Sequence, residues 1–202
     1  MTHCKTKINP IKSRLCKSCK LYINQFPLTE NKAKADVFWV GLSAVQVNDD
    51  DEYQIPLSPS TRSGKLIEDI EKQCNGAATF LKTNLVKCLP LNENKIRYPE
   101  KLEMDKCYPN LTNELEKYSP KIVFLLGRQV SIFTLKKYGF QLPTLGLSFK
   151  YEGFEVNGTI FIPIHHPSYI LVYKRKFVEN YISGIQVIVD HHVTTQNLVM
   201  AI

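Results

Sequence analysis

Four short runs of β-forming residues, separated by segments with helical spacing, restrict this chain to a small set of folds. The runs occupy residues 36–41, 78–86, 121–127 and 160–164. Short apolar runs that end at glycine or another turn residue are typical of strands buried on both faces of a sheet. Helical spacing follows at residues 64–73, 102–117, 128–137 and 174–192. This alternation predicts an α/β fold, with a parallel sheet covered by helices on both faces.

Length and charge further restrict the class of protein that this sequence can encode. The 202 residues suffice for one well-buried domain, and we expect residues 1–202 to form it. No run of eighteen apolar residues and no signal-like N-terminus occurs, so we expect a cytoplasmic protein without a membrane span. The formal net charge of +7 favours an anionic partner such as DNA, although it could simply reflect a soluble surface. A monomer is the default expectation.

Four of the six cysteines form a pattern that suits a metal centre. They are Cys16, Cys19, Cys88 and Cys107. One C-x2-C pair and two dispersed cysteines do not make a zinc ribbon, which needs two close pairs, but they suit a four-thiolate iron–sulfur cluster. Residues 1–35 would then be a cluster-bearing N-terminal extension. Buried free thiols are the alternative, and Cys4 or Cys74 could replace one ligand.

Two polar motifs fall where predicted strands end. His166, after the strand at residues 160–164, can donate to an oxygen that develops negative charge, and Ser168 can bind a phosphate. Asn84, near the end of the strand at residues 78–86, carries the donor and acceptor needed to read a pyrimidine edge. Ligands of open α/β sheets bind outside the carboxyl ends of the strands, so these residues mark the predicted site.

Residues 56–65 combine small hydroxyl side chains, a glycine and two cations before a predicted helix. Such a segment can seat a phosphate at the helix start, although it lacks the spacing of a P-loop. Basic residues near the C-terminus extend the same expectation. The candidate DNA contacts are Ser58, Ser60, Arg62, Ser63, Lys65, Ser168, Lys174 and Arg175.

Taken together, these motifs resemble the uracil-DNA glycosylase superfamily, and most closely its iron–sulfur members. The resemblance extends from about Cys16 to Tyr173 and rests on the four cysteines and on residues 63–67, 83–88, 120–127 and 166–169. It implies a three-layer α/β/α domain with a central four-stranded parallel sheet. It also implies a monofunctional enzyme that flips a base out of DNA, hydrolyses its N-glycosidic bond and leaves an abasic site.

The resemblance assigns roles to individual residues. Asn84 would read the flipped base, and His166 would stabilise negative charge on its O2 atom. The expected base-binding residues are Ser43, Leu57, Asn84 and His166. A [4Fe-4S] cluster on the four cysteines would be structural and would shape a DNA-binding loop.

Departures from the family pattern bear on the substrate. Leu42 replaces a glutamate, and either Asp49 or Asp50 would then orient the attacking water. Leu57 falls where the family has an aromatic residue that stacks on uracil. A roomier pocket would suit a modified pyrimidine, such as a hydroxymethylated or glucosylated cytosine of phage DNA, and hence antiphage defence. The alternatives are an ordinary uracil-DNA glycosylase of base-excision repair and a catalytically inactive DNA-binding module.

Overall fold

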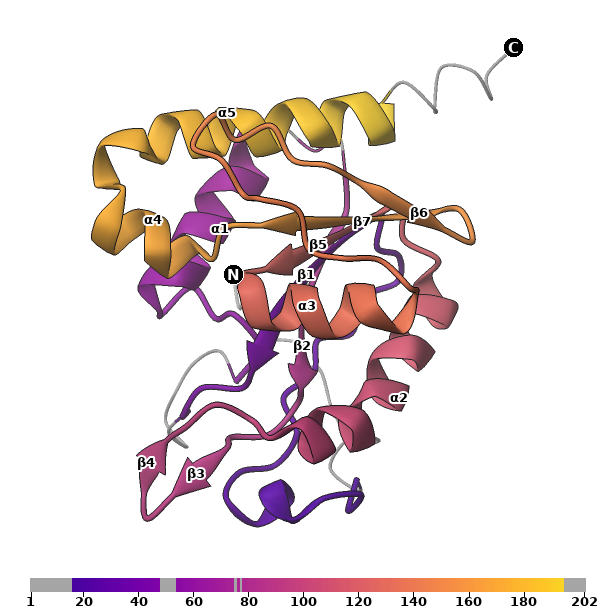
Figure 1. The fold of residues 1–202 in the computed structure, drawn as a ribbon, viewed down its shortest axis with the longest axis vertical. Helices are drawn as coiled ribbons and strands as arrows, with labels where there is room; N and C mark the ends of the chain where they lie inside the picture. Colours follow the sequence, from indigo (N-terminus) through magenta and orange to yellow (C-terminus); the bar gives the residue numbers. More distant parts are fainter. Residues whose placement is uncertain (1–15, 48–53, 75, 77, 195–202) are drawn as a thin grey trace, which may run out of the picture.

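A five-stranded sheet forms the centre of the molecule, in the order β2-β1-β5-β7-β6 (Figure 1). The computed structural model describes residues 16–47, 54–74, 76 and 78–194. The strands of the sheet are β1 (Val37–Ser43), β2 (Phe80–Val86), β5 (Ile122–Leu126), β6 (Phe154–Val156) and β7 (Thr159–Ile164). Strands β2, β1, β5 and β7 pair in parallel, which confirms the predicted four-stranded parallel core.

Helices cover both faces of the sheet and give the three predicted layers (Figure 1). One layer contains α1 (Arg62–Gln73), α4 (Pro167–Tyr173) and α5 (Val178–Val189), and the other contains α2 (Lys101–Tyr118) and α3 (Arg128–Lys137). Trp39 of β1 packs toward the first layer, whereas its neighbours Phe38 and Val40 pack toward the second. Successive strand side chains point to opposite faces, so an uninterrupted apolar run fills both cores.

The sheet extends one strand beyond the sequence prediction. Strand β6 pairs with β7 in antiparallel fashion through a tight turn at Asn157 and Gly158, whose φ angles are 51° and 79°. Asparagine and glycine tolerate the left-handed conformation that a two-residue hairpin turn requires. Among the described residues, β6 is the edge strand of this sheet.

The predicted helix at residues 174–192 is interrupted at its start. A 3₁₀ turn, η3 (Arg175–Phe177), separates α4 from α5, and a π-helical turn, η4 (Asp190–Thr194), follows α5. Tyr181 of α5 is fully buried, and its hydroxyl donates to the His165 carbonyl at 2.8 Å. The C-terminal helix therefore fixes the backbone just before His166.

Two small elements lie outside the main sheet. Strands β3 (Leu91–Asn92) and β4 (Lys95–Ile96) form a hairpin that projects from the body of the molecule, at the lower left of Figure 1. A short 3₁₀ helix, η2 (Lys20–Ile23), precedes β1 and buries Leu21. No helix in the described part of the chain is long and apolar enough to cross a membrane.

Candidate functional site

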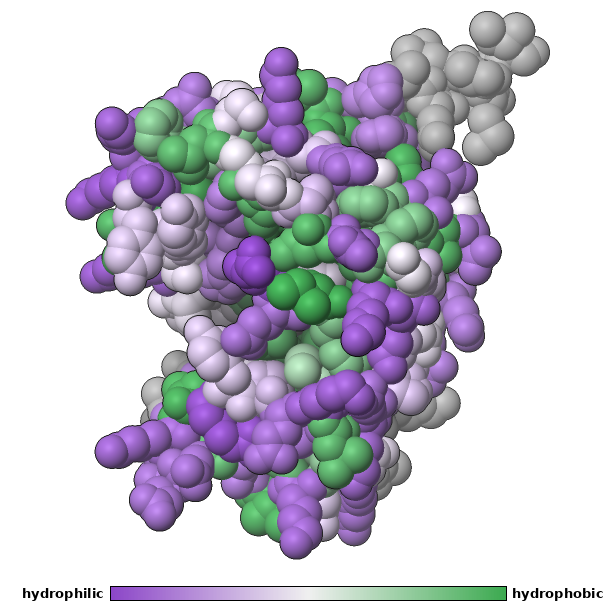
Figure 2. Space-filling view, in the orientation of Figure 1, coloured by the Kyte–Doolittle hydropathy of each residue, from purple (hydrophilic) through white to green (hydrophobic). Residues whose placement is uncertain are grey.

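The carboxyl ends of the four parallel strands open into a cleft of about 880 Å³. It is visible as the hollow at the left edge of Figure 2, between α4 and the β3–β4 hairpin. Six of the sequence-predicted site residues line it, namely Ser43, Leu57, Ser63, Asn84, His166 and Ser168. The topology thus brings together residues as far apart in the sequence as Ser43 and Ser168. They meet at the edge where open α/β sheets bind their ligands.

Asn84 holds an unsatisfied acceptor at the floor of this cleft. The residue is only 2% exposed, and its Oδ1 atom has no hydrogen-bond partner among the described residues. It packs against the bare Cα of Gly41, where a Cβ atom would lie 2.3 Å from Asn84 Oδ1. An unpaired buried acceptor lowers the stability of the fold, so its presence needs an explanation. A ligand that donates a hydrogen bond to Asn84 Oδ1 would explain it.

His166 presents its imidazole from the N-terminus of α4. Its Nδ1 atom accepts a hydrogen bond from the Ser168 backbone N–H at 3.1 Å and lies 2.8 Å from Ser168 Oγ. Because Nδ1 accepts, the neutral ring carries its proton on Nε2. Burial lowers the pKa of His166, which favours this neutral form. The ring can therefore act as a neutral hydrogen-bond donor at Nε2.

The loop at residues 56–61 is a tightly bonded turn. Thr61 caps α1 by accepting the Gly64 N–H at 3.0 Å, and its hydroxyl donates to the Ser58 carbonyl at 2.9 Å. Ser58 is buried, and its Oγ lies 2.8 Å from Ser60 Oγ. Leu57 adopts a left-handed φ of 51°, a strained conformation for leucine. The hydroxyl of Ser58 thus shapes the loop, while Leu57 and Ser63 line the cleft.

We predict that Gly64→Ala destabilises the protein by about 1–3 kcal/mol or more. An added Cβ would lie 2.0 Å from the Ser58 carbonyl oxygen and 2.4 Å from that of Leu57, so the loop must move. Urea unfolding measures the effect. Gly146→Ala is the matched control, because its Cβ would meet only Ser148 Oγ, at 3.7 Å. Equal stability of the two variants would contradict the prediction.

The predicted cationic contacts differ in how available their charges are. Lys65 is exposed, but its ammonium lies 2.8 Å from Glu68 Oε2 and 3.0 Å from Asp69 Oδ1. Arg62 and Arg175 are exposed, and Lys174 is half-buried. None of these four lines the cleft itself. They can only meet a ligand that extends beyond it.

Both candidate water-orienting residues, Asp49 and Asp50, lie outside the described residues. Leu42 lines the cleft.

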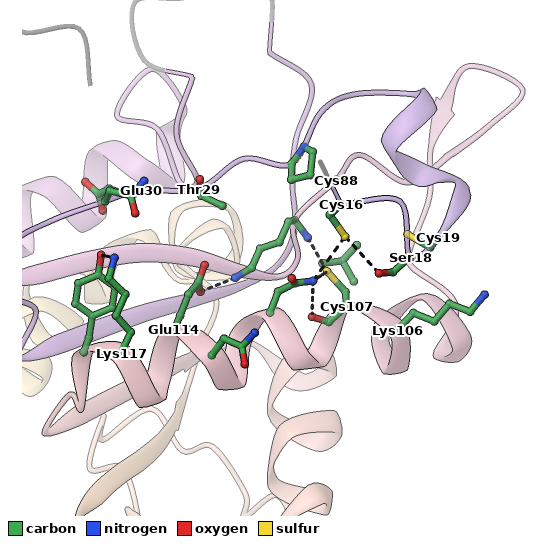
Figure 3. Close-up of a pocket in the computed structure, with 17 residues that line it drawn as sticks. Cys16, Ser18, Cys19, Thr29, Glu30, Cys88, Lys106, Cys107, Glu114 and Lys117 are labelled. Atoms are coloured by element: carbon green, nitrogen blue, oxygen red, sulfur yellow. Dashed lines mark hydrogen bonds and ion pairs between the residues drawn. The ribbon is translucent and has the colours of Figure 1, made fainter. Parts of the chain in front are cut away.

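The four predicted ligand cysteines lie around a second cavity, of about 760 Å³ (Figure 3). Cys16 and Cys19 approach it from the N-terminal segment, Cys88 from just after β2, and Cys107 from α2. Cys74 is buried in the core on the opposite face of the sheet and does not line this cavity. The fold therefore groups the predicted four and separates Cys74 from them.

Hydrogen-bond donors approach the sulfur atoms of Cys107 and Cys16. The Lys87 backbone N–H donates to Cys107 Sγ at 3.4 Å, and Asn110 Nδ2 lies 3.7 Å from Cys107 Sγ and 4.0 Å from Cys16 Sγ. Burial, followed by the charges of the other cysteines, raises the pKa of Cys88 to about 12. Thiolates gathered here would repel one another, and a positive group among them would stabilise them.

A single metal ion does not fit this arrangement. Among the described residues, no three Cys, His, Asp or Glu side chains are grouped so that they could hold one. In a [4Fe-4S] cluster each thiolate binds a different iron atom, so the sulfur atoms need not converge on one point. The donor set of four cysteines around one cavity is compatible with such a cluster.

Several residues of the cleft were missed at the level of sequence. Ile96 lines it from the end of β4, Arg97 and Tyr98 from the residues that follow β4, and Gln129 from the start of α3. The turn-forming sequence Asn92-Glu93-Asn94 between two short runs is the signal that could have indicated this hairpin.

Comparisons with known proteins point to one family. The model of the family described as "Uracil DNA glycosylase superfamily" matches residues 30–186. A type-4 uracil-DNA glycosylase of Saccharolobus solfataricus is 30% identical over 164 residues, covering 77% of this chain and 72% of that protein. A type-4 uracil-DNA glycosylase of Sulfurisphaera tokodaii is 32% identical over 165 residues, covering 76% and 70% respectively. With a family match over most of its length and its cleft at the expected sheet edge, the chain belongs to the uracil-DNA glycosylase superfamily.

Proposed function

We propose that this DNA glycosylase flips a pyrimidine into the cleft and hydrolyses its N-glycosidic bond, with Asn84 and His166 contacting the base. The observation that carries the proposal is the presence, in one cleft, of an unpartnered buried acceptor at Asn84 and a neutral imidazole donor at His166. A pyrimidine edge offers hydrogen-bonding groups to Asn84. The His166 imidazole would stabilise the negative charge that develops on the departing base.

We assign water activation to the acidic run that contains Asp49 and Asp50. In this proposal Asp49 or Asp50 orients the attacking water and balances the positive charge that develops on the sugar. Leu42 cannot do so, because its side chain has no polar atom. Retention of DNA binding with loss of hydrolysis in an Asp49→Asn, Asp50→Asn double variant would support this assignment. Full activity of that variant would contradict it.

The walls of the cleft support a modified pyrimidine as the favoured substrate. Leu57 contributes an aliphatic side chain where an aromatic ring would close over uracil, and Ser43 adds a hydroxyl. We therefore propose hydroxymethylated or glucosylated cytosine of phage DNA as substrate, and a role in antiphage defence.

An excision assay tests the proposed substrate. Anaerobically purified protein is given matched DNAs that carry uracil, cytosine, hydroxymethylcytosine or glucosylated hydroxymethylcytosine, and alkali then reveals abasic sites. Release of a modified cytosine, with little release of uracil, is expected. Efficient release of uracil alone would make the protein a uracil-DNA glycosylase of repair, and release of no base would favour a DNA-binding module.

We further propose that Cys16, Cys19, Cys88 and Cys107 hold a [4Fe-4S] cluster. Support comes from their shared cavity and from the N–H groups directed at the sulfur atoms of Cys16 and Cys107. The cluster would supply positive iron centres that stabilise the thiolates and cross-link the N-terminal segment to β2 and α2. Its role would be structural, since the cysteines line a different cavity from Asn84 and His166.

We predict that Asn84→Ala removes most base excision while leaving stability within about 1 kcal/mol of the parent protein. The lost side chain gives up packing, but it also removes an unsatisfied acceptor whose burial is costly. Replacement of a residue that is retained for ligand binding commonly impairs function without lowering stability. Single-turnover excision and urea unfolding measure the two quantities. Strong destabilisation would identify Asn84 as a structural residue instead.

We predict that affinity for DNA falls steeply as salt increases, because lysine and arginine contacts to phosphates release counterions. Arg62, Lys174 and Arg175 are the proposed cationic contacts, and Ser63 and Ser168 the proposed hydroxyl contacts. Fluorescence anisotropy at increasing KCl measures the slope. Arg175→Ala should reduce it by about one. Salt-independent binding would contradict a phosphate interface.

A further inference from the structure

The β3–β4 hairpin and the residues after it place two exposed apolar side chains at the rim of the cleft. Ile96 is 59% exposed and Tyr98 is 72% exposed, and both line the same cleft as Asn84 and His166. Among the described residues, the Tyr98 ring makes no aromatic contact and its hydroxyl makes no hydrogen bond. Exposed rings of this kind leave apolar surface in water, which a ligand can cover.

The backbone of the segment that carries Tyr98 is held firmly, although the Tyr98 ring is not. The Arg97 guanidinium pairs with both carboxylate oxygens of Glu103, at 2.6 and 2.8 Å. It also donates to the carbonyls of Leu91 at 3.2 Å and Tyr98 at 3.0 Å. Glu103 in turn accepts the Glu100 N–H in the capping box of α2. A bidentate pair of this type fixes direction as well as distance, so the backbone at Tyr98 is tied to α2.

The opposite rim of the cleft is formed by α4. Helix α4 presents Ser168, which lines the cleft, and the exposed side chains of Val172 and Tyr173. The hollow in Figure 2 lies between this helix and the hairpin. The formal net charge of +7 and the proximity of Arg128 suit a polyanion that runs through the cleft rather than an apolar protein surface.

We infer that Tyr98 stacks on a DNA base adjacent to the flipped nucleotide, with Ile96 packing beside it. Every base has a π face, so an aromatic ring supports the strand whatever its sequence. Extrusion of a nucleotide leaves its neighbours unstacked, and a ring held at the rim of the cleft can replace the lost stacking. The inference rests on the proposed function, because it needs a flipped base in the cleft.

Binding to a stable product analogue tests the inference without any need for turnover. The probe is a fluorescein-labelled DNA duplex with one tetrahydrofuran abasic site, and affinity is measured by anisotropy. Stacking on an aromatic ring is worth roughly 1–3 kcal/mol per base, so Tyr98→Ala should weaken binding on the order of 10-fold. Tyr98→Phe keeps the ring and should bind within about 3-fold of the parent. Val187→Ala, at an exposed position of α5 away from the cleft, is the control and should not change affinity.

The outcomes separate this inference from the proposed function. Unchanged binding by Tyr98→Ala, beside tight binding by the parent protein, would overturn the inference alone. Equal losses in Tyr98→Phe and Tyr98→Ala would also overturn it, because the hydroxyl rather than the ring would then matter. Failure of the parent protein to bind any DNA would overturn both. Iron content and urea unfolding of each variant verify that the losses come from the interface and not from the fold.

Discussion

Replacement of His166 with alanine is expected to slow base excision by about 10²–10³-fold, the range for removal of one positioned hydrogen-bond donor. The imidazole is oriented by the Ser168 N–H on Nδ1, so the neutral ring offers a proton at Nε2. That donor is proposed to act only as negative charge develops on the leaving base, so the change should lower the rate far more than the affinity. Single-turnover excision and binding to abasic-site DNA separate the two.

His165 provides the matched control for this prediction. It is the neighbouring histidine, but its Nδ1 atom lies 2.9 Å from the Tyr151 hydroxyl and its ring stacks on Tyr169. Among the described residues it does not line the cleft. His165→Gln should therefore retain the chemical step, although it loses some packing. Loss of excision in His165→Gln with retention in His166→Ala would refute the assignment.

The arrangement of the site follows from local sequence patterns together with one topological rule. Strands β1, β5 and β7 are visible in the sequence as apolar runs, because strands buried on both faces need no polar alternation. Strand β2 is visible as a run of β-forming residues, although it also contains the buried polar residues Lys82, Thr83 and Asn84. Once they are assigned to a parallel sheet, Asn84 and His166 must share an edge. The cleft lined by both residues agrees with that prediction.

Other features depend on contacts that no local pattern reveals. The short strand β6 was missed although its turn, Asn157-Gly158, is a strong hairpin signal, because only three residues follow the β pattern on its N-terminal side. The cleft-lining position of Tyr98 depends on the pairing of Arg97 with Glu103, a contact between side chains on separate elements. The unsatisfied state of Asn84 Oδ1 is likewise a property of packing against Gly41.

Loss of one cavity cysteine is expected to have the largest effect on stability. Cys107→Ser should abolish iron binding and lower the free energy of unfolding by about 3–5 kcal/mol, comparable to the loss of a covalent cross-link over a long loop. Cys107 lies on α2, whereas Cys16 and Cys19 lie at the N-terminal segment, so the proposed cluster would close loops of roughly 90 residues. Iron analysis, visible absorbance and guanidinium unfolding measure the change.

Cys74→Ala distinguishes loss of the cluster from loss of a buried thiol. Cys74 is 2% exposed, close to the 6% of Cys107, but it packs in the core on the opposite face of the sheet. Its replacement should cost only packing energy and leave the iron content unchanged. Equal loss of iron in both variants would show that the cysteines of the cavity are not a distinct ligand set. A colourless parent protein that contains zinc would exclude the cluster, while the predictions for Asn84 and His166, which line the other cavity, would still stand.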